Sequence, residues 1–389
     1  MKRNDWRKAI FAILFLPLLS GCWNAKEVEH MFYAHAVGID YLDGKYNVYV
    51  QILDFSTLGK QESSGGKSET TEGAWVGKGQ GNTIEAALHN LYKTSQRRIY
   101  WGHLNTVILS ESVLKLGIHE GIDLLTRFNE FRYTLWIFGT RAPVKDILLA
   151  SPILEASPVY SQLGDPGDAY KQSSFILPKQ LYRLIAEMKE HAKTPLLPMI
   201  NTVKGYWVDK KQEYSALEVE GYGLIKNGKW NGWLPRTKAK GLRWIERRTA
   251  RAPLVIGSEK QPVASIIFEH PKHEIVPVVR NGKIYFNLTI RVKGNIIEIG
   301  KGASESLLKS KSEKLIREEI RQTYMEGLKQ NTDVLNLLDS LYRKQLPEWQ
   351  RLGQSGKVPL DGSSLQKINV KVNITNSGRT VDRFFDNSN

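Results

Sequence analysis

The N-terminal 22 residues constrain this chain more than any other stretch, because they determine where the remainder must fold. Four basic side chains form a leader: Lys2, Arg3, Arg7 and Lys8. The apolar run that follows, residues 9–19, is interrupted by Pro17 and is shorter than the ~20 apolar residues needed to cross a bilayer. A basic leader, a short apolar core and small residues before a cleavage site are typical of a secretory signal peptide. We therefore predict that residues 1–21 are removed on export.

The signal ends in Leu19-Ser20-Gly21-Cys22, and Cys22 is the only cysteine of the 389 residues. The stretch resembles the lipobox of bacterial lipoproteins, in which the cysteine thiol receives a diacylglyceryl group and becomes the new N-terminus. A lone cysteine has no disulfide partner within its chain. The alternative is an incidental or buried cysteine just inside a signal peptide that is cut elsewhere. We predict lipid attachment at Cys22, since two acyl chains hold a protein to a membrane far more firmly than one.

The composition after Cys22 predicts a globular body without a transmembrane helix. Hydrophobic residues make up 41%, the mean hydropathy is −0.36, and no apolar stretch of about 18 residues follows the signal. The formal charge of +15 falls to about +12 when four basic residues and Asp5 leave with the signal. Such a charge favours anionic lipid headgroups or an acidic protein face as partners. The basic residues are scattered, with the densest cluster at 236–251, so we predict no nucleic-acid partner.

Residues 22–199 predict an N-terminal α/β domain, because strand and helix patterns alternate along them. Asp43-Gly44 between two β-rich runs indicates a hairpin, and the Ser/Gly-rich stretch 56–73 indicates a mobile loop. A helix is predicted to begin near Asn82, with Glu85 completing a capping box. The other expected strands are 75–79, 105–109 and 134–138, and the other expected helices are one through 114–125, 144–149 and 177–191.

The remainder predicts a small strand-rich middle domain, residues 200–262, and a C-terminal α+β domain, residues 263–389. The middle domain is expected to hold a strand at 217–225, a turn at Asn227-Gly228 and a short helix at 240–248. The last domain is expected to hold strands 264–269, 273–279, 284–293 and 367–375, a long helix at 304–330 and a second helix at 334–342. The predicted fold class is thus mixed α/β (α+β), with three dissimilar domains of mixed sheets and helices after a cleaved lipoprotein signal peptide.

The sequence lacks the residue sets that catalysis or metal binding needs. The eight histidines are scattered, and His270 and His273 make a poor ligand pair across Pro271. With one cysteine, thiolate zinc sites are excluded. HExxH and GxSxG do not occur, and the glycines at 77–81 fit neither phosphate-binding pattern. We predict no enzymatic activity, no metal and no cofactor.

Four stretches of the chain resemble the Ger(x)C family of spore germination lipoproteins. They are Gly21-Cys22-Trp23 with Val37-Gly38-Ile39-Asp40; Gly121-Ile122-Asp123-Leu124-Leu125-Thr126-Arg127 with Glu130 and Arg132; Gly221-Tyr222-Gly223-Leu224-Ile225-Lys226 with Gly232-Trp233-Leu234; and Asp333-Val334-Leu335 with Pro347-Glu348-Trp349. They occur in the family's order, over residues 21 to about 375. Two positions depart from the family: Asn24-Ala25 replaces charged residues, and Phe128-Asn129 replaces Asp-Pro.

The resemblance implies a three-domain protein that is lipid-anchored to the outer face of the spore inner membrane. There it would be the C subunit of a nutrient germinant receptor, beside integral membrane A and B subunits, and needed for assembly or signalling during germination. The resemblance implies no catalysis, and it leaves open whether this subunit contacts the nutrient. The alternative is a solute-binding lipoprotein of a membrane transporter, with two similar lobes around a polar cleft. A wall-modifying enzyme is disfavoured by the missing motifs.

Two sets of side chains could form partner surfaces. Trp230, Trp233 and Trp244 cluster in the middle segment, either as a carbohydrate or membrane-subunit surface or as core filling, and we favour the core. Arg127, Glu130 and Arg132 at a helix end form either a partner-facing charge patch or, more commonly, a solvated and locally salt-bridged terminus.

Overall fold

The computed structural model describes most of the predicted globular body. The described residues are 6, 31–53, 75–127, 130–150, 153, 157–209, 212–258, 260–300, 303–353 and 360–375. The predicted anchor at Cys22, the predicted mobile loop at 56–73 and the tail after Gly378 lie outside them. Within these residues, none of the helices combines the length and the hydropathy that crossing a bilayer requires.

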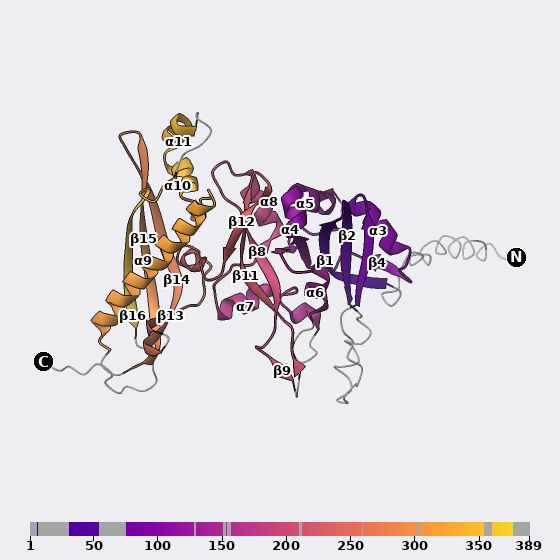
Figure 1. Ribbon diagram of the computed structural model, residues 1–389, viewed down its shortest axis with the longest axis horizontal. Coiled ribbons are helices and arrows are strands. Elements are labelled where there is room, and N and C mark those ends of the chain that lie inside the picture. The colour runs from indigo at the N-terminus through magenta and orange to yellow at the C-terminus, as the bar shows by residue number, and fades with distance from the viewer. Residues whose placement is uncertain are drawn as a thin grey trace.

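A ten-stranded mixed sheet forms the larger part of the molecule (Figure 1). Its path runs β12-β11-β8-β6-β5-β1-β2-β3, while the short strands β4 and β7 pair with β1 and β6. The strands are β1 (Met31–Leu42), β2 (Lys45–Leu53), β3 (Trp75–Gly81), β4 (Arg98–Tyr100), β5 (Thr106–Ser110), β6 (Trp136–Thr140), β7 (Lys179–Gln180), β8 (Leu196–Val203), β11 (Ala216–Lys226) and β12 (Lys229–Pro235). The predicted hairpin is confirmed: β1 and β2 pair in antiparallel register, and Asp43 and Gly44 have φ of 51° and 75°.

Helices cover both faces of this sheet. In β5, Val107 and Leu109 face one apolar core, and Ile108 faces the other, as expected for a strand buried on both sides. The first core is closed by α3 (Ile84–Tyr92), α4 (Glu111–Leu116), α5 (Ile118–Arg127) and α8 (Leu181–Lys189). The second is closed by α6 (Val144–Leu149). The short helices η4 (Pro158–Tyr160) and α7 (Pro166–Gln172) follow α6 along the chain.

Three helices predicted within residues 22–199 differ from those observed. The N-cap of α3 is Thr83, whose hydroxyl accepts from the amide of Ala86, so the proposed capping box from Asn82 to Glu85 is wrong. The helix expected through 114–125 is two helices, because Gly117 adopts φ 152° between α4 and α5. The helix expected over 177–191 is the shorter α8.

A second, four-stranded sheet holds the C-terminal part of the described chain, in the order β13-β14-β15-β16. Its strands are β13 (Ala252–Ser258), β14 (Gln261–Arg280), β15 (Lys283–Ile299) and β16 (Leu365–Thr375). The two strands predicted at 264–269 and 273–279 are one strand, β14, whose register with β15 shifts between Glu269 and Lys272. The long helix α9 (Glu305–Lys329) lies against this sheet, followed by α10 (Leu337–Lys344) and α11 (Leu346–Gly353).

One core cluster joins the two sheets. It includes Leu196 and Leu224 from the large sheet, Phe268 and Leu288 from the small one, and Trp244 from the connecting helix η5 (Lys240–Trp244). Strands β11 and β12 lie in the predicted middle segment and bond to the large sheet, while β13 bonds to the small one. The mixed α+β class is confirmed. The predicted domain boundaries lie at 199/200 and 262/263. Whether they separate independent folding units stays a prediction.

Candidate functional site

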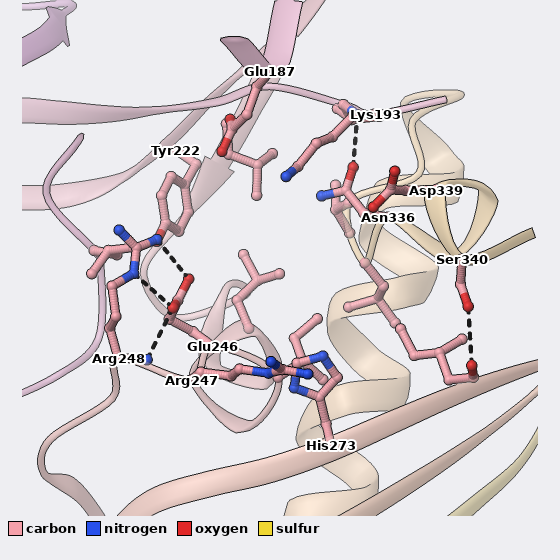
Figure 2. Close-up of a pocket in the computed structure, with 18 of the residues that line it drawn as sticks. Glu187, Lys193, Tyr222, Glu246, Arg247, Arg248, His273, Asn336, Asp339 and Ser340 are labelled. Carbon is pink, nitrogen blue, oxygen red and sulfur yellow. Dashed lines mark hydrogen bonds and ion pairs between the residues drawn. The ribbon is translucent and has the colours of Figure 1, made fainter. Parts of the chain in front are cut away.

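A cavity of about 460 Å³ lies where the two sheets meet (Figure 2). Its walls come from α8 and the start of β8, from the turn after η5, from β14 and from α10. Apolar side chains form part of the lining: Leu177, Leu196, Leu242, Ile245, Ile275, Val334 and Leu335. The remaining lining is mostly charged, so the cavity combines an apolar wall with several ionisable side chains.

Two ion pairs occupy one side of the cavity. Lys179 is buried and its amine donates to the Glu187 carboxylate. Burial lowers the pKa of Lys179, and Glu187 opposes that shift. The Glu246 carboxylate accepts from Nε and Nη2 of Arg248 at 2.9 and 3.1 Å. Burial raises the pKa of Glu246, but the hydrogen bonds from Arg248 outweigh it and leave that pKa lowered. Both carboxylates are therefore already neutralised.

Two cations in the lining have no hydrogen-bonding or ion-pair partner in the described part of the chain, whereas Lys344 donates to the carbonyl of Ile275 at 2.8 Å. Among the described residues, the side chains of Lys193 and Arg247 make no hydrogen bond or ion pair. Figure 2 shows the Lys193 amine directed into the cavity and the Arg247 guanidinium beside the His273 ring. Burial, helped by the positive charge of Arg247, lowers the pKa of His273, and its buried Nδ1 has no partner in the described part of the chain. The lining also holds one exposed carboxylate without an ion pair among the described residues, Glu274, so the excess charge of the cavity is positive.

Contacts across the cavity hold its walls together. The Asn336 side chain accepts from the amide of Thr194 at 2.7 Å. Arg343 of α10 pairs with Glu190 at 3.2 Å, and Ser340 donates to the carbonyl of Ile275 in β14 at 3.0 Å. Since α10 and its N-cap contact the segment between α8 and β8 on one side and β14 on the other, a group bound here would contact both parts of the fold.

This arrangement suits binding more than covalent chemistry. Lys193 and Arg247 can bind a carboxylate or a phosphate by donating hydrogen bonds to it, and the apolar lining can contact a small organic group. Among the described residues, no group of three or more His, Cys, Asp or Glu side chains is placed to hold a metal ion. The prediction singled out the basic cluster at 236–251 but missed Lys193, because pairing between distant segments decides which cations stay free.

The residues singled out from the sequence do not gather at this cavity. Arg127 pairs with Asp123 at 2.7 Å, and Glu130 lies 3.8 Å from Arg98, as a locally salt-bridged helix end would. Trp244 is fully buried in the joining core. Trp230 packs against the core of the large sheet, and the Trp233 ring lies 5.6 Å from the Arg141 guanidinium. The three tryptophans therefore form no shared exposed surface, in agreement with the interpretation that they fill cores.

Comparison with known proteins places nearly the whole chain in one family. Residues 24–202 match the family model described as "Spore germination protein N-terminal domain". Residues 220–378 match "Spore germination B3/ GerAC like, C-terminal". The junction between the two matches lies inside the large sheet, since the first ends within β8 and the second begins within β11.

Individual relatives agree with the family models. Spore germination protein KC of Bacillus subtilis (strain 168) is 24% identical over 374 residues, which cover 89% of this chain and 90% of that protein. Spore germination protein B3 of the same strain is 23% identical, with 74% of each chain covered. The crystal structure of the GerBC protein matches the fold with a TM-score of 0.53 at 16% identity, covering 90% of this chain and all of that one. The chain belongs to the Ger(x)C family of spore germination proteins.

Proposed function

We propose that this protein is the lipid-anchored C subunit of a spore nutrient germinant receptor. In this proposal Cys22 carries the lipid, the globular body lies on the outer face of the spore inner membrane, and it assembles with the integral A and B subunits. The subunit is non-catalytic and serves receptor assembly or signalling. The observation that carries the proposal is the position of the family match, which begins at residue 24, directly after Leu19-Ser20-Gly21-Cys22.

The architecture favours a subunit over a transporter's solute-binding lipoprotein. Such a binder is expected to have two similar lobes around a cleft. Here a ten-stranded mixed sheet with helices on both faces adjoins a four-stranded sheet that packs on α9. The two sheets are dissimilar and share a continuous core, which supports a receptor subunit over a two-lobed solute-binding protein.

The anchor is tested with a strain that lacks this gene and any paralogue that compensates, complemented with the wild-type chain or with Cys22→Ala. Without the thiol no thioether to a diacylglyceryl group forms, so we expect Cys22→Ala to be lost from the spore membrane fraction or degraded. The germination response to nutrients should fall to that of the deletion. Immunoblots of membrane fractions and germination assays measure both, and crosslinked membranes report the A and B subunits.

Ser20→Ala is the matched control, because it keeps a small side chain before the cysteine. It should behave like the wild type. Normal membrane retention and germination with Cys22→Ala would contradict the anchor. A deletion strain that responds normally to every nutrient would contradict the receptor role itself.

The cavity favours a second candidate function, the binding of a small anionic solute by this subunit. Inorganic phosphate serves as the probe, and a ligand at about 100 times its dissociation constant stabilises a protein by ~2.7 kcal/mol. We expect phosphate to raise the Tm of the wild-type chain but not of the double variant Lys193→Gln/Arg247→Gln. Lys309→Gln/Lys311→Gln removes the same charge from the exposed face of α9 and should keep the shift. Equal shifts in all three chains would exclude the cavity as the site.

A further inference from the structure

A short two-stranded ribbon projects from the large sheet between β8 and β11. It consists of β9 (Val208–Asp209) and β10 (Gln212–Glu213), which pair only with each other. The amide of Tyr214 extends the ribbon by donating to the carbonyl of Trp207 at 2.8 Å. Figure 1 shows β9 standing away from the sheet, on the side opposite α10 and α11.

Three consecutive large apolar side chains are exposed on this ribbon. Tyr206 is 74% exposed, Trp207 53% and Val208 68%. Trp207 and Val208 are consecutive residues of the paired segment, so their side chains point to opposite faces of a narrow ribbon, and Tyr206 lies in the bend just before them. None of the three belongs to an apolar core of the described chain. A contiguous exposed apolar group of this kind marks an interaction site.

The surrounding charges indicate the chemistry of the partner. Lys204 is exposed beside the aromatic residues, and over residues 204–213 the sequence has three lysines against Asp209 and Glu213, a net charge of +1. Trp and Tyr are enriched at membrane–water interfaces, where the ring is apolar and its polar edge stays hydrated. Lysines near such rings attract anionic headgroups, and the chain as a whole carries +15.

We propose that this ribbon is a membrane-contact site, which places Tyr206, Trp207 and Val208 in the headgroup layer of a bilayer that contains anionic lipid. A lipid surface suits side chains on both faces of one ribbon, because headgroups and acyl chains surround an inserted tip. A protein groove would cover one face. The ribbon is a second membrane contact, separate from the N-terminus, and would restrict how the globular body is oriented. The inference goes beyond the proposed function and needs no receptor partner.

The test uses the full exported chain and vesicles of phosphatidylcholine with phosphatidylglycerol, some carrying brominated acyl chains. Bromine quenches tryptophan emission only within the bilayer, so the quenched share of the vesicle-bound protein reports insertion. The chain has ten tryptophans, and replacing the one that is inserted removes the part of the emission that bromine quenches. We expect Trp207→Phe to abolish most of the bromine quenching. Trp349→Phe is the matched control, because α11 lies on the far side of the molecule and Trp349 packs against the joining core.

A second measurement keeps the membrane contact separate from the lipid anchor. In the Cys22→Ala background, Tyr206→Ser/Trp207→Ser/Val208→Ser should lower vesicle binding by about tenfold or more relative to Cys22→Ala alone. Leu346→Ser on α11, where the side chain is 44% exposed, should leave it unchanged. Lys204→Gln should weaken binding only to vesicles that contain anionic lipid.

Unchanged quenching in Trp207→Phe, or no vesicle binding of the Cys22→Ala chain, would overturn the proposal. So would protection of Trp207 that requires receptor proteins and is absent in pure lipid, since that result assigns the ribbon to a protein partner. An equal Tm in the variants and the wild type confirms that they fold. Bromine quenching reports only whether Trp207 enters the bilayer. It therefore tests the ribbon independently of whether Cys22 carries a lipid.

Discussion

Replacing Glu319 with alanine is expected to lower the free energy of unfolding by about 3–5 kcal/mol, because it leaves a buried guanidinium without its counter-charge. Arg243 of η5 has a side chain that is 2% exposed, and its Nη2 donates to both Glu319 oxygens at 3.0 and 2.9 Å. Trp244 Nε1 donates to the same carboxylate at 2.7 Å. Burial lowers the pKa of Arg243, and the Glu319 charge opposes that shift. Chemical denaturation of the purified protein measures the loss.

Glu318→Ala is the control for this prediction. Glu318 is the preceding residue of α9, is 57% exposed and lies 3.8 Å from Lys314. An exposed pair of this kind contributes ~0–1 kcal/mol, so its loss should be small. The double variant Arg243→Met/Glu319→Leu removes both charges and should recover much of the stability. Equal effects of Glu318→Ala and Glu319→Ala would show that the buried pair does not join η5 to α9 as described.

The free energy of unfolding is expected to fall by about 2 kcal/mol as the pH rises from about 4 to 7, through the contribution of Asp333. Burial raises the pKa of Asp333 from 3.8 to about 6, and the amide that Leu338 donates to its Oδ2 at 2.8 Å opposes the rise. A raised folded-state pKa stabilises the protein fully below the unfolded pKa of 3.8. That stabilisation is lost as the pH passes through about 6.

Asp333→Asn should remove this part of the pH dependence while its side-chain oxygen still accepts from the amide of Leu338. The quantity to compare is the difference in unfolding free energy between wild type and variant at pH 4, 5, 6 and 7, which cancels the other carboxylates. Glu318→Gln, on the exposed face of α9, should keep the wild-type slope. A pH-independent difference between wild type and Asp333→Asn would mean that Asp333 titrates alike in the folded and unfolded states.

Local patterns in the sequence predicted the elements that are determined by residues close together in the chain. Asp43-Gly44 predicted the β1–β2 hairpin, and the alternation of Ile368, Val370, Val372 and Ile374 predicted β16, where all four are buried. The break at Gly117 was missed because the apolar spacing continues across it, and only the backbone conformation interrupts the helix.

Pairing between distant segments was beyond such patterns. The alternation over 217–225 predicts a strand there but not its partner, and β11 pairs with β8 in the large sheet. The same limit applies to the cavity, where Lys193 and Arg247 are ordinary surface cations in the sequence. Their lack of partners follows from where α8, β14 and α10 come together. Cys22 is the reverse case, since its predicted role depends on the linear signal alone.

The parallel pairing of β15 with β16 also bears on the order in which the protein can fold. The two strands are separated by the whole of α9, α10 and α11, so β15 is synthesised long before the strand that covers its free side. Until Leu365–Thr375 is available, β15 presents an open row of amides and carbonyls, which is a template for pairing with other chains. Completion of this sheet is a slow, non-local step. The C-terminal strand thus covers the apolar strand β15 and itself becomes the edge, where the exposed Lys367 and Lys371 discourage pairing with other chains. Loss of this strand would harm the protein through misassembly as well as through lost contacts.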